Sequence, residues 1–329
     1  MQECKRLFRR DKVFLLCLAG GVALILLFSL FNVWKMVKEL EELRMFYKNT
    51  HGEAFAAEFF SDHLSMFMNM VEQICLSMMK YVFVTVILAH IIKWSVLEGK
   101  RGKEFQNLLP VKSSGYVTYD YICGMLFLWI PMIIGVIATI AIFANRYGFA
   151  FMGGNVNDIW GKAMRVLIFV SFLYSLLVFS KKITRYIPGI FLMVLVISYM
   201  GPMLLIWYTG ECDGLFWNWS WYDAADSGNC LLMLLCVPVL VALSYWCDKK
   251  RDIAGNGLFY FKSVHFLMMT IIFAEFFCLF TISEIIPWGM AANIIGALLA
   301  GAVTAGVHYL TWGRTGNLSA FDGKKEEKK

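Results

Sequence analysis

The chain has 329 residues, of which 59% are hydrophobic and 16% are charged, and its mean hydropathy is +0.63. A soluble domain carries about 25% charged residues, so this chain lacks the polar surface that a water-soluble globule of its size needs. The composition excludes a soluble enzyme, a disordered chain and a nucleic-acid-binding domain. The formal net charge of +6 becomes informative only when the charges are assigned to the two sides of a membrane.

Eight apolar stretches are long enough to cross about 30 Å of hydrocarbon as helices, which takes about 20 residues each. Helices are required because the bilayer offers backbone groups no hydrogen-bond partner, and these runs do not alternate as barrel strands would. The predicted fold is an all-α integral membrane protein that forms a single domain over residues 1–329. The expected spans are Val13–Trp34, Ile74–Val96, Tyr119–Ala144, Met164–Ser180, Ile187–Tyr208, Cys230–Cys247, Val264–Ile282 and Trp288–Thr311.

The distribution of basic residues favours one orientation. With both termini in the cytoplasm, 22 of the 30 Lys and Arg residues face the cytoplasm and 7 face outside, while Lys80 lies within a span. Cytoplasmic loops characteristically carry such an excess, so we expect both termini in the cytoplasm. We expect the first span to be a retained anchor, because its apolar run exceeds that of a signal peptide and a charged helical stretch follows it.

Two outside segments offer surfaces for a ligand. Residues 35–72 are predicted to be helical, because KMVKELEELRMF continues the register of the first span, Thr50-His51-Gly52 interrupts it and a second amphipathic stretch follows. This segment either caps the bundle at the membrane surface or gathers a ligand. The loop Thr209–Asn229 combines FWNWSWY with four acidic residues. It either belongs to the interfacial aromatic belt or forms a platform for a cationic or amphipathic substrate.

Few residues within the spans suggest chemistry. Cys212 and Cys230 flank one outside loop, where an oxidising compartment could join them in a disulfide. Glu275 lies near the middle of the seventh span, where a charge costs about 2.5–3.5 kcal/mol. It either pairs with a polar group on another helix or lines a substrate path. Other ionisable residues lie near span ends, where their side chains can reach the polar surface, namely Lys80, His90, Lys93, Asp120 and His308.

Sequence signatures of catalysis are missing from the chain. It has no GxxxxGK[ST] phosphate loop, no HExxH, no GxSxG and no Cys/His cluster with the spacing of a zinc site. We therefore expect a protein that is not an enzyme and that holds neither a metal nor a cofactor of its own.

The cytoplasmic loop after the second span, EGKRGKEFQNLLPV over Glu98–Val111, is predicted to form a short amphipathic helix. Phe105, Leu108 and Leu109 can share one face, and Pro110 ends the helix. A helix of this kind at the cytoplasmic surface needs lipid or a protein partner to cover its apolar face.

This segment resembles the coupling segment of ABC exporter permeases of the type-two class, whose pattern is roughly E-(K/R)-x-x-G-(T/S)-x-x-x-L-x-x-L-P-(V/I)-(S/K). Lys103 departs from the pattern, which usually has Thr or Ser there. A weaker likeness is KKRDIAG at Lys249–Gly255, where related Gram-positive permeases often carry an R-x-x-E-x-A-G-like stretch. The specific likeness covers about thirty residues in all, and the matching positions of the first segment are Glu98, Gly102, Leu108, Leu109, Pro110 and Val111, followed by Lys112-Ser113-Ser114.

The resemblance implies a permease subunit in a bacterial cytoplasmic membrane. It would assemble with a second permease copy or homologue and with two copies of a separate ABC ATPase subunit, which would hold ATP and Mg. ATP-driven closure of the ATPases would push on Glu98–Val111 and shift the second and third spans. The implied second cytoplasmic contact consists of Arg251, Asp252 and Gly255, with the basic segment Lys5–Lys12 alongside. The implied ATPase-coupling residues are Glu98, Gly102, Glu104, Phe105, Leu108, Leu109, Pro110 and Val111.

Members of that family export drugs, antimicrobial or toxic peptides, lipids or polysaccharide, or confer resistance to such agents, and most have six spans rather than eight. We favour an amphipathic peptide, drug or lipid-like substrate, because the 19 Met and 28 Phe residues offer adaptable apolar surface. Two alternatives stay open. A self-sufficient secondary transporter predicts several mid-span charges and paired broken helices. A membrane sensor or scaffold protein that signals through residues 35–72 predicts no dependence on ATP.

Overall fold

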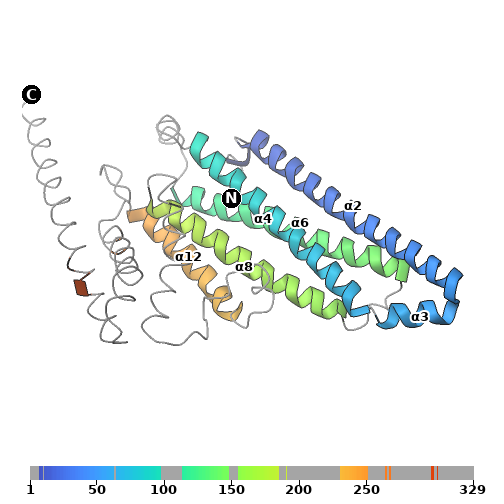
Figure 1. The fold of residues 1–329 in the computed structure, drawn as a ribbon. Helices are drawn as coiled ribbons and strands as arrows, with labels where there is room; N and C mark the ends of the chain where they lie inside the picture. The colour runs from blue at the N-terminus through green and yellow to red at the C-terminus, as the bar shows by residue number, and fades with distance from the viewer. Residues whose placement is uncertain are drawn as a thin grey trace, which may run out of the picture. The chain divides into compact units, whose positions relative to one another are not determined.

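The structure, a computed structural model, describes residues 7–9, 11–62, 64–97, 113–147, 155–184 and 230–250 and the single positions 190, 264, 267, 298, 299 and 302. The described residues form helices and no strand, which confirms the all-α prediction for this part of the chain. The helices, shown in Figure 1, are α2 (Lys12–His51), α3 (Glu53–Asp62), α4 (Leu64–Leu97), α6 (Ser113–Tyr147), α8 (Asn155–Ile183) and α12 (Cys230–Lys250).

The chain divides into two compact units, which are Met1–Val178 with Trp219–Lys249, and Phe179–Asn218 with Lys250–Lys329. The described helices belong to the first unit, apart from the last residues of α8 and α12. The arrangement given below is that of the first unit, and the single domain over residues 1–329 stays a prediction.

Five described helices are long and apolar enough to cross a membrane, which is compatible with a multi-pass membrane protein. They coincide with the first, second, third, fourth and sixth expected spans. The other three expected spans fall almost wholly outside the described residues, so the count of eight and the cytoplasmic termini stay predictions. The five candidate spans are Lys12–His51, Asn69–Ser95, Gly115–Tyr147, Val156–Ile183 and Cys230–Lys249.

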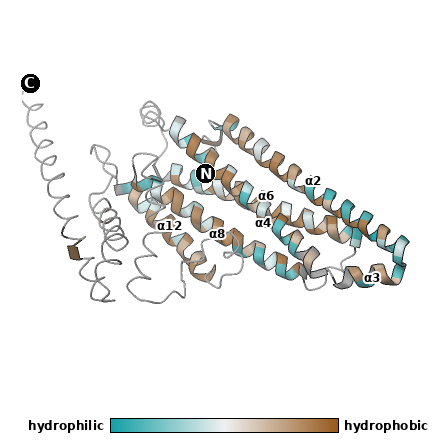
Figure 2. Cartoon of the chain, in the orientation of Figure 1, coloured by the Kyte–Doolittle hydropathy of each residue, from teal (hydrophilic) through white to brown (hydrophobic). Residues whose placement is uncertain are grey.

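The exposed surface of these helices is apolar where a soluble protein would be polar. Figure 2 shows hydrophobic residues along the middle of the helices and hydrophilic ones toward their ends and over the second half of α2. Large aliphatic and aromatic side chains on these helices are about half exposed or more, as lipid-facing side chains are. Examples are Leu24, Leu27 and Phe28 on α2, Ile130, Ile134 and Ile137 on α6, and Leu231, Leu235 and Val239 on α12.

Helices α2, α4 and α6 pack against one another, and ion pairs show how their ends meet. Lys93, near the carboxyl end of α4, pairs with Asp11 before α2 and with Asp120 near the start of α6. Helix α4 therefore runs antiparallel to both neighbours. We call this level of the bundle the Lys93 end. The opposite level, where Glu72 of α4 pairs with Lys162 of α8, is the Glu72 end.

Helix α2 continues without a break from the first span into the predicted outside segment, and its 40 residues make a rod of about 60 Å. It ends at His51, where Gly52 has a φ of +90°, which favours glycine. The predicted interruption at Thr50-His51-Gly52 is therefore confirmed. The stretch that follows is divided between α3 and the first turns of α4, which continues directly into the second span.

Helix α3 folds back against the end of α2. The Tyr47 and Phe59 ring centroids lie 4.3 Å apart, and Lys48 Nζ donates a hydrogen bond to Glu53 Oε1 at 3.0 Å. That hydrogen bond and the positive charge of Lys48 lower the pKa of Glu53. The contacts close a helical hairpin, α2–α3, beyond the apolar part of the bundle.

Gly124 is expected to be required for the packing of α6 against α8. A methyl group at this position would overlap the ring of Tyr174, which is fully buried. We expect Gly124→Ala to lower the free energy of unfolding by about 1–3 kcal/mol, as overpacked cores do. Thermal unfolding in detergent measures the change.

Gly20→Ala is the matched control, because nothing lies within 4 Å of the added methyl group. This substitution removes a helical glycine and should leave the protein as stable or up to about 1 kcal/mol more stable. Equal unfolding temperatures for the two variants would contradict the predicted clash.

Candidate functional site: a buried charge cluster and a polar cavity

Three charged side chains meet at the Lys93 end. Lys93 Nζ lies 2.9 Å from Asp11 Oδ2 and 3.6 Å from Asp120 Oδ1. The side chains of Lys93 and Asp11 are 1% exposed and that of Asp120 is 3% exposed. Two carboxylates therefore face one ammonium group, away from solvent, at the junction of α2, α4 and α6. We call these three residues the charge cluster.

The local sequence explains how the three charges reach one level. Asp11 directly precedes α2, in the position of a helix cap, yet its carboxylate makes no capping hydrogen bond and contacts Lys93 instead. Lys93 lies in the penultimate turn of α4, and Asp120 in the second turn of α6. Because α4 is antiparallel to the other two helices, these terminal positions coincide.

Aromatic rings enclose the ammonium group of Lys93. Its Nζ lies 4.3 Å from the centroid of the Tyr119 ring and 5.5 Å from that of Phe14. Phe8 packs edge-on against Tyr119, with centroids 5.0 Å apart. The rings exclude water and supply cation–π attraction, so the cluster stands in a low-dielectric setting where each charge depends on its partners.

Four consecutive residues of α6, Thr118–Tyr121, connect the cluster to the neighbouring helices. Asp120 pairs with Lys93 of α4 through its carboxylate, while its backbone carbonyl accepts a 2.8 Å hydrogen bond from Tyr174 Oη of α8. Successive helical residues point about 100° apart, so four of them can reach neighbours on all sides.

The residues on either side of Asp120 extend the connections to α8 and α12. Tyr121 Oη donates to the Ser175 carbonyl of α8 and bonds Ser244 Oγ of α12, both at 3.1 Å. Thr118 bonds the hydroxyl of Tyr245, also on α12. Thr118–Tyr121 therefore joins α6 to α4, α8 and α12, and we call it the α6 hub.

His90 lies one turn before Lys93 and is completely buried. Its Nδ1 lies 2.8 Å from the carbonyl oxygen of Val86, so Nδ1 carries the proton and donates it. The ring packs edge-on against Phe14 and Tyr174, with centroids 5.8 Å and 5.5 Å away. His90 thus completes the aromatic wall between the charge cluster and α8.

These positions correct one prediction from the sequence. Placement near span ends suggested that His90, Lys93 and Asp120 extend to the polar surface, and this is wrong because all three are buried. The physical reason is that each near-end side chain lies level with a polar or oppositely charged group on a neighbouring helix. Lys80, in contrast, is exposed.

The site residues implied by the ABC resemblance fall outside the described part of the chain, and so do Glu275 and Cys212. Cys230 is described and is the half-buried first residue of α12, so its predicted disulfide with Cys212 stays a prediction. The undescribed coupling and contact residues are Glu98, Gly102, Glu104, Phe105, Leu108, Leu109, Pro110, Val111, Arg251, Asp252 and Gly255.

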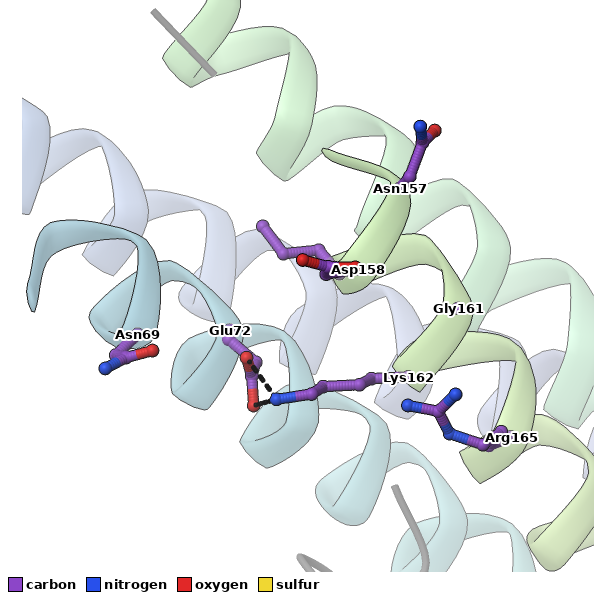
Figure 3. A pocket seen from close by; sticks show the side chains of 8 residues that line it. Asn69, Glu72, Asn157, Asp158, Gly161, Lys162 and Arg165 are labelled. Carbon is purple, nitrogen blue, oxygen red and sulfur yellow. Dashed lines mark hydrogen bonds and ion pairs between the residues drawn. The ribbon is translucent and has the colours of Figure 1, made fainter. Parts of the chain in front are cut away.

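A polar cavity of about 240 Å³ lies between α4 and α8 at the Glu72 end (Figure 3). Glu72 of α4 and Lys162 of α8 point toward each other, and both carboxylate oxygens lie 3.0 Å from Lys162 Nζ. Asp158 and Arg165 of α8 and Asn69 of α4 also line it. Sequence reasoning missed this cavity, although the pairing of outside acids and bases near the second and fourth spans was a usable signal.

Comparison with known proteins finds no family model, no curated protein and no solved structure that matches this chain. The resemblance of Glu98–Val111 to a coupling segment stays an expectation drawn from the sequence pattern.

Removal of the ammonium group from the charge cluster is expected to destabilise the protein. Lys93→Met leaves two buried carboxylates without a cation, which should cost about 3–5 kcal/mol. The triple variant Lys93→Met, Asp11→Asn and Asp120→Asn removes all three charges and should recover most of that loss. Thermal unfolding in detergent compares the two variants.

Lys35→Met is the control, because it removes an exposed Lys35–Glu39 pair through the same substitution. Such a pair is worth about 0.5 kcal/mol at most. If Lys93→Met unfolds at the same temperature as Lys35→Met, the cluster does not stabilise the junction of α2, α4 and α6.

Proposed function

We propose that this chain is the membrane-spanning subunit of an ATP-driven exporter in a bacterial cytoplasmic membrane. In this proposal, a separate ATPase docks on Glu98–Val111, and its motion moves the helices on either side of that segment. The observation that carries the proposal is the ion pairing at the Lys93 end, because it locks together the two helices that flank the docking segment.

The two paired residues, Lys93 and Asp120, lie close in sequence to the two ends of the proposed docking segment. Lys93 lies five residues before Glu98, and Asp120 lies nine residues after Val111. A force applied to the segment between them acts on two helix ends that are already joined by buried charges. It therefore moves α4 and α6 together instead of being absorbed by a local bend, as rigid-body transitions require.

Similar polar contacts connect α4 and α6 to other helices of the first unit. Asp11 joins α2 to Lys93, and the α6 hub joins α8 and α12. A displacement at Glu98–Val111 would therefore pass from α4 and α6 to α2, α8 and α12 through these polar contacts. This is the behaviour expected of a permease that changes access between two membrane faces.

The helix directions support the proposed topology. The carboxyl-terminal halves of α8 and α12 both reach the α6 hub, through Ser175 and Ser244, so these helices run the same way. The expected fourth and sixth spans share a direction for the same reason, since one further span lies between them in the sequence. In the proposed orientation, the Lys93 end faces the cytoplasm and the ATPase.

A groove between α2 and α4 supports an amphipathic substrate. It has a volume of about 360 Å³, and Phe28 and Tyr81 at its rim are largely exposed. Methionine and aromatic side chains supply adaptable apolar contacts, while hydroxyl and amide groups can orient a polar end. The lining consists of Phe28, Ser29, Asn32, Met36, Met70, Gln73, Ile74, Ser77, Met78 and Tyr81.

One observation favours a second candidate, a self-sufficient secondary transporter. The charge cluster holds two carboxylates for one ammonium group, and buried unequal charges in a membrane bundle are typical of ion and proton pathways. This candidate predicts substrate movement that follows an ion gradient and needs no ATPase. A sensor or scaffold protein predicts neither dependence.

The first test is recovery of the ATPase with the tagged protein from its native membrane, followed by mass spectrometry. We expect the wild-type chain to recover an ABC ATPase subunit. The variant Phe105→Asp with Leu109→Asp should recover at least about tenfold less, because charges replace the apolar anchors of the docking face.

The matched control is Leu43→Asp with Phe46→Asp, which places the same charges on exposed positions of the α2–α3 hairpin. It should recover as much ATPase as the wild type. Recovery of no ATPase with any version would overturn the exporter proposal. Transport measurements with imposed ion gradients would then decide between the secondary transporter and the sensor.

A second test separates docking from coupling. Asp120→Asn keeps the size of the side chain and leaves Lys93 paired with Asp11, so the fold and the bound ATPase should be retained. The link between α4 and α6 is weakened, and we expect substrate-stimulated ATPase activity to fall by about fivefold or more, the lower end of usual coupling free energies.

ATPase assays of the complex in liposomes measure this effect. Arg146→Gln serves as the control, since Arg146 pairs with Glu41 at the opposite end and is half exposed. If Asp120→Asn leaves stimulation at the wild-type level, the charge cluster has no part in coupling.

A further inference from the structure

Helices α4 and α8 are in contact at both ends of the bundle, through different kinds of side chain. At the Lys93 end, the buried rings of His90 and Tyr174 pack edge-on, with centroids 5.5 Å apart. At the Glu72 end, both carboxylate oxygens of Glu72 lie 3.0 Å from Lys162 Nζ. Figure 3 shows this pair reaching across the space between the two helices, beside the polar cavity.

The solvent exposure of the charged groups indicates which of the two ends can open. The side chains of Lys162 and Glu72 are 26% and 21% exposed, whereas those of the charge cluster are at most 3% exposed. When Glu72 and Lys162 separate, water can hydrate both groups and offset much of the lost attraction. Separation within the charge cluster would leave buried charges without partners. The Glu72 end is therefore the end that opens at the lower cost in free energy.

The polar cavity provides water-accessible space beside the pair. Its volume of about 240 Å³ is enough for several water molecules, each of which occupies about 30 Å³. Water in this space can take over the hydrogen bonds of the carboxylate and the ammonium group as they move apart. The pair can therefore break without leaving either charge desolvated.

Inward from the pair, both helices become apolar on the same side. Leu76 lies one turn after Glu72 on α4, and Val166 lies one turn after Lys162 on α8, so each follows its charged residue along one side of its helix. Leu76 is 2% exposed and Val166 is completely buried. The pair thus stands between a polar space and a dry apolar interior, and its separation would let water reach these two side chains first.

We propose that Glu72 and Lys162 form a latch that opens while the Lys93 end stays closed, so that α4 pivots away from α8 about the Lys93 end. This inference rests on the proposed function for the direction of access, because the Glu72 end faces outside in the proposed orientation. The closed latch shuts the outer side of the bundle, and its opening gives the outer side access to the apolar sides of α4 and α8.

A cysteine at position 166 reports whether the latch is open. In purified Val166→Cys in lipid nanodiscs, we expect a membrane-impermeant maleimide to label the new thiol slowly, and peptide mapping distinguishes it from the native cysteines. Addition of Lys162→Gln should raise the labelling rate about tenfold, which corresponds to a loss of about 1.4 kcal/mol from the closed state.

Cys123 is the internal control for the fold. It is completely buried and packs with Tyr119 beside the charge cluster, so it should stay unlabelled in every variant as long as the Lys93 end stays closed. The exchange variant Glu72→Lys with Lys162→Glu restores an oppositely charged pair and should return the labelling rate at position 166 to within about threefold of the original. Arg146→Gln removes an ion pair between α2 and α6 and should leave that rate unchanged.

Two outcomes would overturn the latch. Equal labelling of Val166→Cys with and without Lys162→Gln would mean that the pair does not hold α4 against α8. Labelling that rises at Cys123 as well would mean that the Lys93 end opens too, so that it is not the pivot.

ATP distinguishes failure of the latch from failure of the exporter proposal. In the complex with its ATPase, ATP should raise the labelling of Val166→Cys while the Glu72–Lys162 pair is intact. If Lys162→Gln changes the labelling but ATP does not, the latch stands and the exporter proposal fails. If ATP drives transport while neither ATP nor Lys162→Gln changes the labelling, the exporter proposal stands and the latch is overturned.

Discussion

A lysine ammonium group inside a membrane bundle must find negative charge within the protein, and this requirement determines how the ends of α2, α4 and α6 meet. Lys93 is enclosed by Asp11, Asp120 and two aromatic rings. Three helices must therefore end at one level, in one rotational setting, for the ammonium group to be compensated. Apolar packing alone would tolerate sliding of one helix past another, whereas a buried ion pair does not. The charge cluster thus specifies the register of the first unit more than it adds to its stability.

Helix α6 makes the contacts that connect these three helix ends to the rest of the unit. Its hub of four residues bonds to α4, α8 and α12 and contacts the chain before α2. Close approach of α8 requires the absence of a side chain at Gly124. Some serine hydroxyl groups also donate within their own helix, as Ser171 and Ser175 do to carbonyls four residues earlier at 2.7 Å, and Ser171 in addition accepts a 2.8 Å hydrogen bond from Trp129 Nε1 of α6. The polar groups that reach between helices, together with the close packing at Gly124, specify the arrangement of the described helices.

The described helices could be predicted from the sequence, but the contacts that join one helix to another could not. The length of the first apolar run and the presence of Gly52 predicted helix α2, its unbroken extension beyond the span and its end. These features depend only on local composition and on one glycine. The charge cluster was not foreseen, although Asp11, Lys93 and Asp120 all lie at expected span ends on the same predicted side. Charge near a span end is ordinarily solvated, and the pattern of one sequence does not say which helices are neighbours. The polar cavity depends on the same missing knowledge, since Glu72 and Lys162 are 90 residues apart.

Because α2 is long, a small rotation at one of its ends can produce a large displacement at the other. The helix is about 60 Å long, is anchored at its base by Asp11 and is braced further along, where Glu41 meets Arg146. Its final ten residues extend beyond that brace and carry α3. A rotation of about 5° at the base of such a rod displaces its far end by about 5 Å, roughly the rise of one helical turn. In the proposed coupling, a small rotation of α2 at the buried lysine would therefore produce its largest displacement at the tip of the α2–α3 hairpin.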